Sequence, residues 1–193
     1  ALRSGAGAVV AGIPESVNDI MEVKLTEVMT LPLNETDKKT LSLTAYHKIK
    51  DKLDWADSVL IGPGLSDNEE TKELIRKIVK ENDNNFVLDA DAIPAFRNDL
   101  KLLKNKNVIL TPVEDDALCK KIDEMTDSGI NVITLSSDIS DSKRLTYVGC
   151  DYLKSGETAG RLVGLLSGGK ANLCIVTGSL AHKGHKQRVE GVS

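Results

Sequence analysis

Residues 58–91 read SVLIGPGLSDNEETKELIRKIVKENDNNFVLDAD, and this stretch decides the fold. An apolar run at 58–61 is followed by glycines, then by an amphipathic pattern at 69–81, then by a second apolar run at 86–88. The middle segment places its apolar residues on one stripe between Glu and Lys residues, which predicts a helix. Two apolar runs joined by one helix are typical of a β-α-β unit, so we expect two parallel strands here.

The same alternation continues along the chain. Further apolar runs lie at 8–11, 28–31, 108–110, 132–135, 146–148 and 173–176, and further helical patterns at 116–127 and 152–166. Continuous apolar runs are typical of strands that a parallel sheet buries on both faces. We therefore expect an α/β fold, a three-layer α/β/α sandwich with a mostly parallel, doubly wound (Rossmann-like) sheet of about eight strands. A closed barrel is not favoured, because it needs roughly 250 residues.

Composition narrows the function classes. The chain has 193 residues, of which 40% are hydrophobic and 28% charged, and its formal net charge is -4. These values are ordinary for a globular protein and exclude intrinsic disorder. No basic excess favours nucleic acid, and no apolar run approaches the roughly 20 residues that span a membrane. We expect a cytoplasmic protein without a signal peptide, whose partner is a small-molecule ligand and whose oligomeric state is not indicated.

Cysteine and histidine patterns give no metal site. The three cysteines, Cys119, Cys150 and Cys174, form no C-x-x-C pair, so we expect buried, reduced thiols. His182 and His185 lie three residues apart without a third ligand nearby in the sequence, which favours a surface pair. The N-terminal residues suit the last turn of a helix closed by Gly5, which favours a fragment with chosen boundaries.

Two motifs at the ends of the predicted strands are candidate ligand sites. Gly62 and Gly64 let a backbone pass close to a ligand, and the helix that follows could offer free N–H groups to an anion. A tight turn alone would require the same glycines. Asp89 and Asp91 follow the next strand, where open α/β sheets bind ligands, and could meet a metal-bound phosphate or a ribose hydroxyl. Alternatively, one of the two carboxylates caps the next helix.

Five stretches in the first part of the chain carry a family likeness. They are Ala1–Gly7, Ile13–Glu15, Ala56–Leu65, Val87–Ala92 and Ile109–Pro112. With them, residues 1–112 resemble the ADP/ATP-dependent NAD(P)H-hydrate dehydratases of the ribokinase-like superfamily. The resemblance implies that a hydroxyl on a hydrated nicotinamide ring is phosphorylated and the phosphate then eliminated. It also implies that Gly62, Gly64, Asp89 and Asp91 line the substrate side, with ADP or ATP and NAD(P)H hydrate as ligands.

The chain departs from this family's pattern in three places. After Thr-Pro, Val113-Glu114-Asp115 replaces the usual His-Pro-Gly-Glu, and Pro94 stands where the family has asparagine. The Gly-x-Gly-Asp element, which in the family supplies the anion hole and the catalytic aspartate, has no counterpart in these residues. We therefore assign no catalytic residue and expect no dehydratase turnover.

The second part of the chain carries a different likeness. Its matching stretches are Ala117–Leu135, Asp138–Arg144, Tyr147–Asp151, Gly156–Gly160, Ile175–Gly178 and Gln187–Gly191. Residues 113–193 resemble the ligand-binding core of periplasmic sugar-binding proteins and LacI-type regulators. This resemblance implies sugar contacts from Asp138, Asp151, Lys186 and Arg188.

The two likenesses meet at residues 109–114. Thr111 as N-cap, Pro112 as first helical residue and Glu114 two residues later predict a helix start that either parent would accept. Our hypothesis is an engineered chimera of 1–112 and 113–193 in one continuous α/β domain, without native catalytic activity and with no required cofactor. The alternatives are residual nucleotide, phosphate or NAD(P)H-hydrate binding, an ADP-dependent dehydratase (a carbon–oxygen lyase) if further segments exist, or a small-sugar binding protein.

Overall fold

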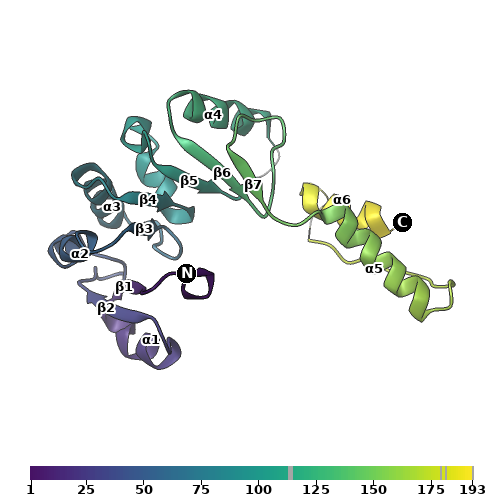
Figure 1. The fold of residues 1–193 in the computed structure, drawn as a ribbon, viewed down its shortest axis with the longest axis horizontal. Helices are drawn as coiled ribbons and strands as arrows, with labels where there is room; N and C mark the ends of the chain where they lie inside the picture. Colours follow the sequence, from purple (N-terminus) through teal and green to yellow (C-terminus); the bar gives the residue numbers. More distant parts are fainter. Residues whose placement is uncertain (113–114, 179, 181, 193) are drawn as a thin grey trace. The chain divides into compact units, whose positions relative to one another are not determined.

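A computed structural model describes residues 1–112, 115–178, 180 and 182–192 (Figure 1). The strands are β1 (Val10–Pro14), β2 (Met29–Leu33), β3 (Ser58–Ile61), β4 (Asn85–Leu88), β5 (Asn107–Leu110), β6 (Asn131–Leu135) and β7 (Thr146–Val148). The α-helices are α1 (Asn18–Lys24), α2 (Tyr46–Leu53), α3 (Glu69–Glu81), α4 (Asp116–Asp127), α5 (Tyr152–Leu166) and α6 (Lys183–Val192). Short 3-10 helices are η1 (Leu2–Ser4), η2 (Glu15–Val17), η3 (Leu43–Ala45), η4 (Ala90–Phe96) and η5 (Leu100–Leu103).

The strands form parallel pairs, which confirms the α/β class and its three layers. β1 pairs with β2 from Val10↔Met29 to Pro14↔Leu33, and these two form their own sheet. The second sheet has the strand order β3-β4-β5-β6-β7. The prediction of about eight strands in one sheet is wrong, because the larger sheet of the described residues has five strands and β1 and β2 stand apart from it.

The strand predicted at 173–176 is also not formed. This segment has no regular structure, and Leu173 and Val176 are 50% and 93% exposed. Its apolar and β-branched side chains favour a strand, but a strand also needs a neighbour for its backbone hydrogen bonds. Within the described part of the chain, no other strand pairs with this segment.

The chain forms two compact units, Ala1–Asn107 and Val108–Ser193. In the first unit the apolar stripe of α3 is buried as predicted. Asn68 caps this helix, because its Oδ1 accepts hydrogen bonds from the Glu70 and Thr71 amides at 2.9 and 3.2 Å. The fully buried side chains around the stripe include Leu33, Leu74, Ile75, Phe86, Leu88, Phe96 and Leu103. This core fixes the carboxyl ends of β3 and β4.

In the second unit, α4 covers the residues 116–127 that the apolar pattern predicts, but its cap differs from the one predicted. Its N-cap is Asp115, whose Oδ1 accepts hydrogen bonds from the Ala117 and Leu118 amides at 2.6 and 3.4 Å. The predicted start is therefore wrong at Thr111 and Pro112, which lie outside any helix. The short side chain of Asp115 takes the capping role that the Thr-Pro pattern suggested for Thr111. The remaining predicted position, Glu114, lies outside the described residues, as does Val113.

Helices α5 and α6 pack against each other across glycines. A Cβ built on Gly156 would overlap the Arg188 carbonyl oxygen, and one on Gly191 would overlap the Leu153 carbonyl oxygen. The absence of side chains at these positions therefore lets the two helix backbones approach closely. Among the cysteines, Cys119 is half-buried whereas Cys150 and Cys174 are exposed, and all three are free. The expectation of buried thiols is thus wrong for the latter two, since neither lies in a packed core.

The sequence also predicts a closed N-terminal turn and no apolar run long enough to span a membrane. Gly5 closes η1 with a left-handed φ of 100°, as the N-terminal pattern predicts. Among the helices in the described residues, none has the length and apolar character needed to span a membrane.

Candidate functional site

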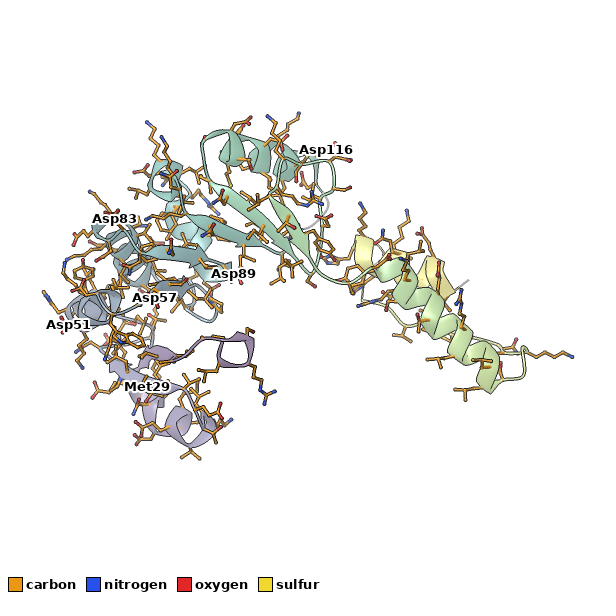
Figure 2. The ribbon with its side chains drawn as sticks, in the orientation of Figure 1. Met29, Asp51, Asp57, Asp83, Asp89 and Asp116 are labelled. Atoms are coloured by element: carbon orange, nitrogen blue, oxygen red, sulfur yellow. The ribbon has the colours of Figure 1, made fainter. Side chains whose placement is uncertain are left out.

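The candidate site lies where β3 and β4 end. The two strands pair in parallel with Ile61 opposite Leu88, and the Asp89 amide continues the ladder by donating to the Ile61 carbonyl oxygen at 3.1 Å. Figure 2 shows Asp89 at the carboxyl end of β4, the edge at which open α/β sheets bind ligands. The pairing of β3 with β4 thus brings the glycine motif and the two predicted carboxylates together.

The loop at residues 62–66 requires glycine at two positions for two different reasons. Gly62 is buried with a φ of 140°, and a Cβ at this position would overlap the carbonyl oxygen of Asp89. Gly64 has a φ of 77°, but a Cβ at this position would meet no neighbouring atom within 4 Å, so only its backbone angle requires glycine. The loop is closed by the Leu65 amide, which donates to the Gly62 carbonyl oxygen at 3.2 Å. The tight-turn interpretation of this motif therefore holds, and it leaves the apex at Gly64 open.

The Asp89 carboxylate is half-buried and caps η4. Its Oδ1 accepts a hydrogen bond from the Ala90 amide at 2.7 Å, and its carbonyl oxygen accepts one from the Ala92 amide at 3.1 Å. Ala90 has a φ of 44°, an uncommon left-handed conformation that costs an alanine roughly 1–2 kcal/mol. One carboxylate thus caps the next helix, as one of the two interpretations of the sequence proposed. The second oxygen of Asp89 has no hydrogen bond in the described residues.

The Asp91 carboxylate contacts the loop instead. Its Oδ2 accepts a hydrogen bond from the Ser66 amide at 2.8 Å, across 25 residues of sequence. Ser66 itself has a left-handed φ of 65°. Sequence reasoning missed Ser66, because a backbone amide leaves no trace in the pattern of side chains.

Acidic groups surround the start of α3. Lys72 forms ion pairs with Asp67 and Glu69, and the hydrogen bond from Lys72 holds the pKa of Asp67 below its ordinary value. Hydrogen bonds from Ser42 and the Leu43 amide likewise lower the pKa of Glu70. Asn68 already caps the amides of this turn. The idea that this helix offers free N–H groups to an anion is therefore wrong, because the amides are capped and the nearby carboxylates are ionised.

The predicted sugar contacts are engaged with other partners of the chain. Asp138 accepts hydrogen bonds from Arg144 Nε and Nη2 at 2.5 and 2.7 Å, and Asp151 caps α5 by accepting from the Lys154 amide at 3.0 Å. Lys186 lies 3.9 Å from Glu190 in an ion pair on α6. No ion pair or hydrogen bond joins any two of the four predicted residues in the part of the chain that is described. Arg188 contacts Tyr152 and Cys150, which flank Asp151 in the sequence, and the role of the four residues as sugar contacts stays a prediction.

A groove of about 270 Å³ lies between α5, the segment 175–178 and α6. Along it, Thr177 Oγ1 lies 3.1 Å from His185 Nδ1. The guanidinium of Arg188 stacks over the Tyr152 ring at 4.4 Å. His182 and His185 lie with ring centroids 5.5 Å apart, and no group of three or more metal-ligating side chains occurs among the described residues.

Comparison with known proteins gives a family match. The family model described as NAD(P)H-hydrate dehydratase matches residues 1–147. The bifunctional NAD(P)H-hydrate repair enzyme of Moorella thermoacetica is 37% identical over 114 residues, 58% of this chain and 22% of that protein. The ATP-dependent (S)-NAD(P)H-hydrate dehydratase of Schizosaccharomyces pombe is 33% identical over 88 residues, 42% of this chain and 27% of that protein. The chain thus spans about a quarter of the length of each of these curated relatives.

Matches to solved structures have TM-scores under 0.5. A chain of the XylFII-LytSN complex is 27% identical with a TM-score of 0.48, covering 70% of this chain and 52% of that one. GanP, a glucose-galactose binding protein from Geobacillus stearothermophilus, is 21% identical with a TM-score of 0.44, covering 97% of this chain and 52% of that one. At these TM-scores, the likeness of 113–193 to sugar-binding proteins stays a prediction.

The family match overturns the hypothesis of an engineered scaffold without native activity. The match runs through the expected join at residue 112 and continues to residue 147. The curated relatives are named as hydrate repair enzymes or dehydratases. The missing motifs were misleading, because an element absent from these residues does not exclude activity. The division into segments 1–112 and 113–193 stays a prediction.

Proposed function

Because the chain belongs to the NAD(P)H-hydrate dehydratase family, we propose that it forms the substrate side of an ADP- or ATP-dependent NAD(P)H-hydrate dehydratase, a carbon–oxygen lyase. The observation that carries this proposal is the close approach of the Gly62 backbone to Asp89 at the carboxyl ends of β3 and β4. This is the edge of a parallel sheet at which ligands bind, and the family match includes both residues.

In the reaction of this family, the edge at β3 and β4 would bind the hydrated nicotinamide ring. A hydroxyl on the hydrated nicotinamide ring loses its proton and receives a phosphoryl group from the nucleotide, and the ring then loses that phosphate together with a proton from the neighbouring carbon as its double bond is restored. The half-buried Asp89 carries one carboxylate oxygen without a hydrogen bond in the described residues. That oxygen is placed to accept a hydrogen bond from a substrate hydroxyl, which would orient the substrate for transfer.

The electrostatics of the site favour hydroxyl groups over phosphates. Asp67, Asp89 and Asp91 lie on the two segments that follow β3 and β4, and Glu69 begins α3. A pKa of Asp67 below its ordinary value means that this carboxylate is ionised at neutral pH. Lys72 compensates the charges of Asp67 and Glu69, whereas Asp89 and Asp91 have no ion pair in the described residues, so these two repel a nucleotide phosphate and offer acceptors to the hydroxyl groups of a ribose or a hydrated ring. We assign the nucleotide phosphates to a different part of the enzyme.

The experiment is a turnover assay with NADH hydrate. The chain is incubated with NADH hydrate and either ADP or ATP, and the return of NADH is followed by its absorbance. Isothermal titration of NADH hydrate without nucleotide measures binding in parallel. Turnover, or binding that Asp89→Asn weakens, supports the proposal. Absence of both turnover and binding with a folded chain contradicts it.

A further inference from the structure

One hydrogen bond ties the two halves of the candidate site together. The Ser66 amide donates to Asp91 Oδ2 at 2.8 Å, and this contact joins the loop after β3 to the turn after β4. Both partners lie outside the strands, so no sheet hydrogen bond holds them in place. The Leu65–Gly62 hydrogen bond closes the loop on itself, and the contact with Asp91 is the one that ties its Ser66 end to the turn after β4.

The same contact lies between two unusual backbone conformations. Ser66 has a φ of 65° and Ala90 a φ of 44°, both in the left-handed region that non-glycine residues avoid. Residues in such conformations persist only where their surroundings hold them. Asp91 is the residue after Ala90, and its carboxylate accepts a hydrogen bond from the Ser66 amide. This hydrogen bond holds Ser66 in its left-handed conformation.

Asp89 and Asp91 use their carboxylate oxygens differently, so they differ as hydrogen-bond acceptors for a ligand. Asp89 uses Oδ1 for the Ala90 amide that follows it, and its other oxygen has no hydrogen bond in the described residues. Asp91 uses Oδ2 for an amide 25 residues away, on the other side of the site. The former contact caps a helix locally, whereas the latter sets the distance between two segments.

We infer that Asp91 is a positioning residue, which holds the Gly62–Ser66 loop in the shape that the substrate meets and leaves the direct contact to Asp89. The substrate half of this inference rests on the proposed function. The structural half concerns the loop alone.

Hydrogen exchange of the ligand-free chain tests the structural half. In Asp91→Ala the Ser66 amide loses its acceptor, so its exchange should speed up about tenfold. In Asp91→Asn the amide oxygen still accepts the bond, so exchange should stay within about threefold of the wild type. Asp99→Ala is the matched control, because the Asp99 side chain makes no capping hydrogen bond. Unchanged exchange at Ser66 in Asp91→Ala would overturn the inference.

Steady-state kinetics with NADH hydrate test the substrate half. Asp91→Ala should raise KM about tenfold, Asp91→Asn should leave it near the wild-type value, and the double variant Asp91→Ala with Ser66→Gly should recover part of the loss. Recovery is expected because glycine adopts the left-handed conformation without strain. A KM in Asp91→Asn as high as in Asp91→Ala would show a direct contact by the charge and overturn the inference. If the wild type neither binds nor converts NADH hydrate, the proposed function fails, and the exchange result alone decides the role of Asp91.

Discussion

Gly62 lies against the backbone carbonyl of Asp89 so closely that a Cβ on Gly62 would overlap the carbonyl oxygen. This relationship joins the end of β3 to the end of β4 without any side chain between them. It explains why glycine is required at this position on steric grounds, beyond the freedom of φ that a turn needs. The candidate site is thus built on a backbone contact.

Substituting Gly62 by alanine should therefore cost much stability. The new methyl group meets a carbonyl oxygen of the buried sheet end, which cannot move away as a flexible side chain can. We expect a loss of about 3 kcal/mol or more in the free energy of unfolding, measured by urea denaturation. Gly64→Ala is the control, because its Cβ meets nothing within 4 Å and it should cost only about 1 kcal/mol for its φ of 77°. Equal losses in the two variants would contradict the close approach.

The glycines of α5 likewise include one in close backbone contact and one without a close neighbour. A Cβ on Gly156 would overlap the Arg188 carbonyl oxygen on α6, whereas a Cβ on Gly164 meets nothing within 4 Å. Gly156→Ala should therefore speed hydrogen exchange throughout α6 by separating the two helices. Gly164→Ala should leave α6 unchanged and add about 0.5–1 kcal/mol to the stability of α5 through helix propensity. Unaltered exchange of α6 in Gly156→Ala would show that the helices do not pack through this glycine.

The buried hydroxyl of Thr71 holds the chain before η3 against α3. Thr71 is fully buried, and its Oγ1 donates to the Leu41 carbonyl oxygen at 2.8 Å. Thr71→Val keeps the shape but removes the donor, so it should cost about 1–2 kcal/mol in urea denaturation. Thr158→Val is the control, since the hydroxyl of this exposed threonine donates to the Lys154 carbonyl oxygen of its own helix, and the change should alter stability by about 0.5 kcal/mol or less. A cost for Thr71→Val no larger than for Thr158→Val would refute the role of the hydroxyl.

The Asp138–Arg144 pair should make stability depend on pH. Partial burial raises the pKa of Asp138, but hydrogen bonds from Arg144 and Thr134 outweigh it, so the pKa lies below the ordinary value of 3.8. A lowered pKa gives stability that is fully present above the ordinary value and is lost as the pH falls through the lowered one. Arg144→Gln should destabilise the chain by about 1–2 kcal/mol near neutral pH and flatten the acid limb of the urea stability profile. An acid limb as steep as that of the wild type would contradict this account.

The fold could be predicted where local signals agree with packing. The stripe of Leu74, Ile75 and Ile78 predicted α3 because the same residues satisfy helix periodicity and core burial. Residues 173–176 show the limit, since their composition favours a strand but strand formation depends on a neighbour that composition cannot specify. The apolar pattern predicts the bounds of α4, but the cap was expected at Thr111 because two capping patterns overlap within a few residues, and Asp115 takes the cap.

The location of the candidate site could be predicted from the sequence, but the different hydrogen bonds of Asp89 and Asp91 could not. Glycines after one strand and aspartates after the next indicate the carboxyl edge of a parallel sheet. The pattern cannot say that Asp91 reaches back to the Ser66 amide, because that contact depends on the register of β3 with β4. Nor does it show that the α3 amides are already capped by Asn68.

The most direct test of the central claim is the KM for NADH hydrate in Asp89→Asn beside Asp99→Asn. Asp89 faces the substrate in this account, and neutralising it weakens a charge-assisted hydrogen bond, so KM should rise about tenfold or more. Asp99 makes no capping hydrogen bond and lies in the same unit, so its variant should behave like the wild type. A KM for Asp89→Asn equal to that of Asp99→Asn, in chains of equal stability, would contradict the claim that this edge of the sheet binds the substrate.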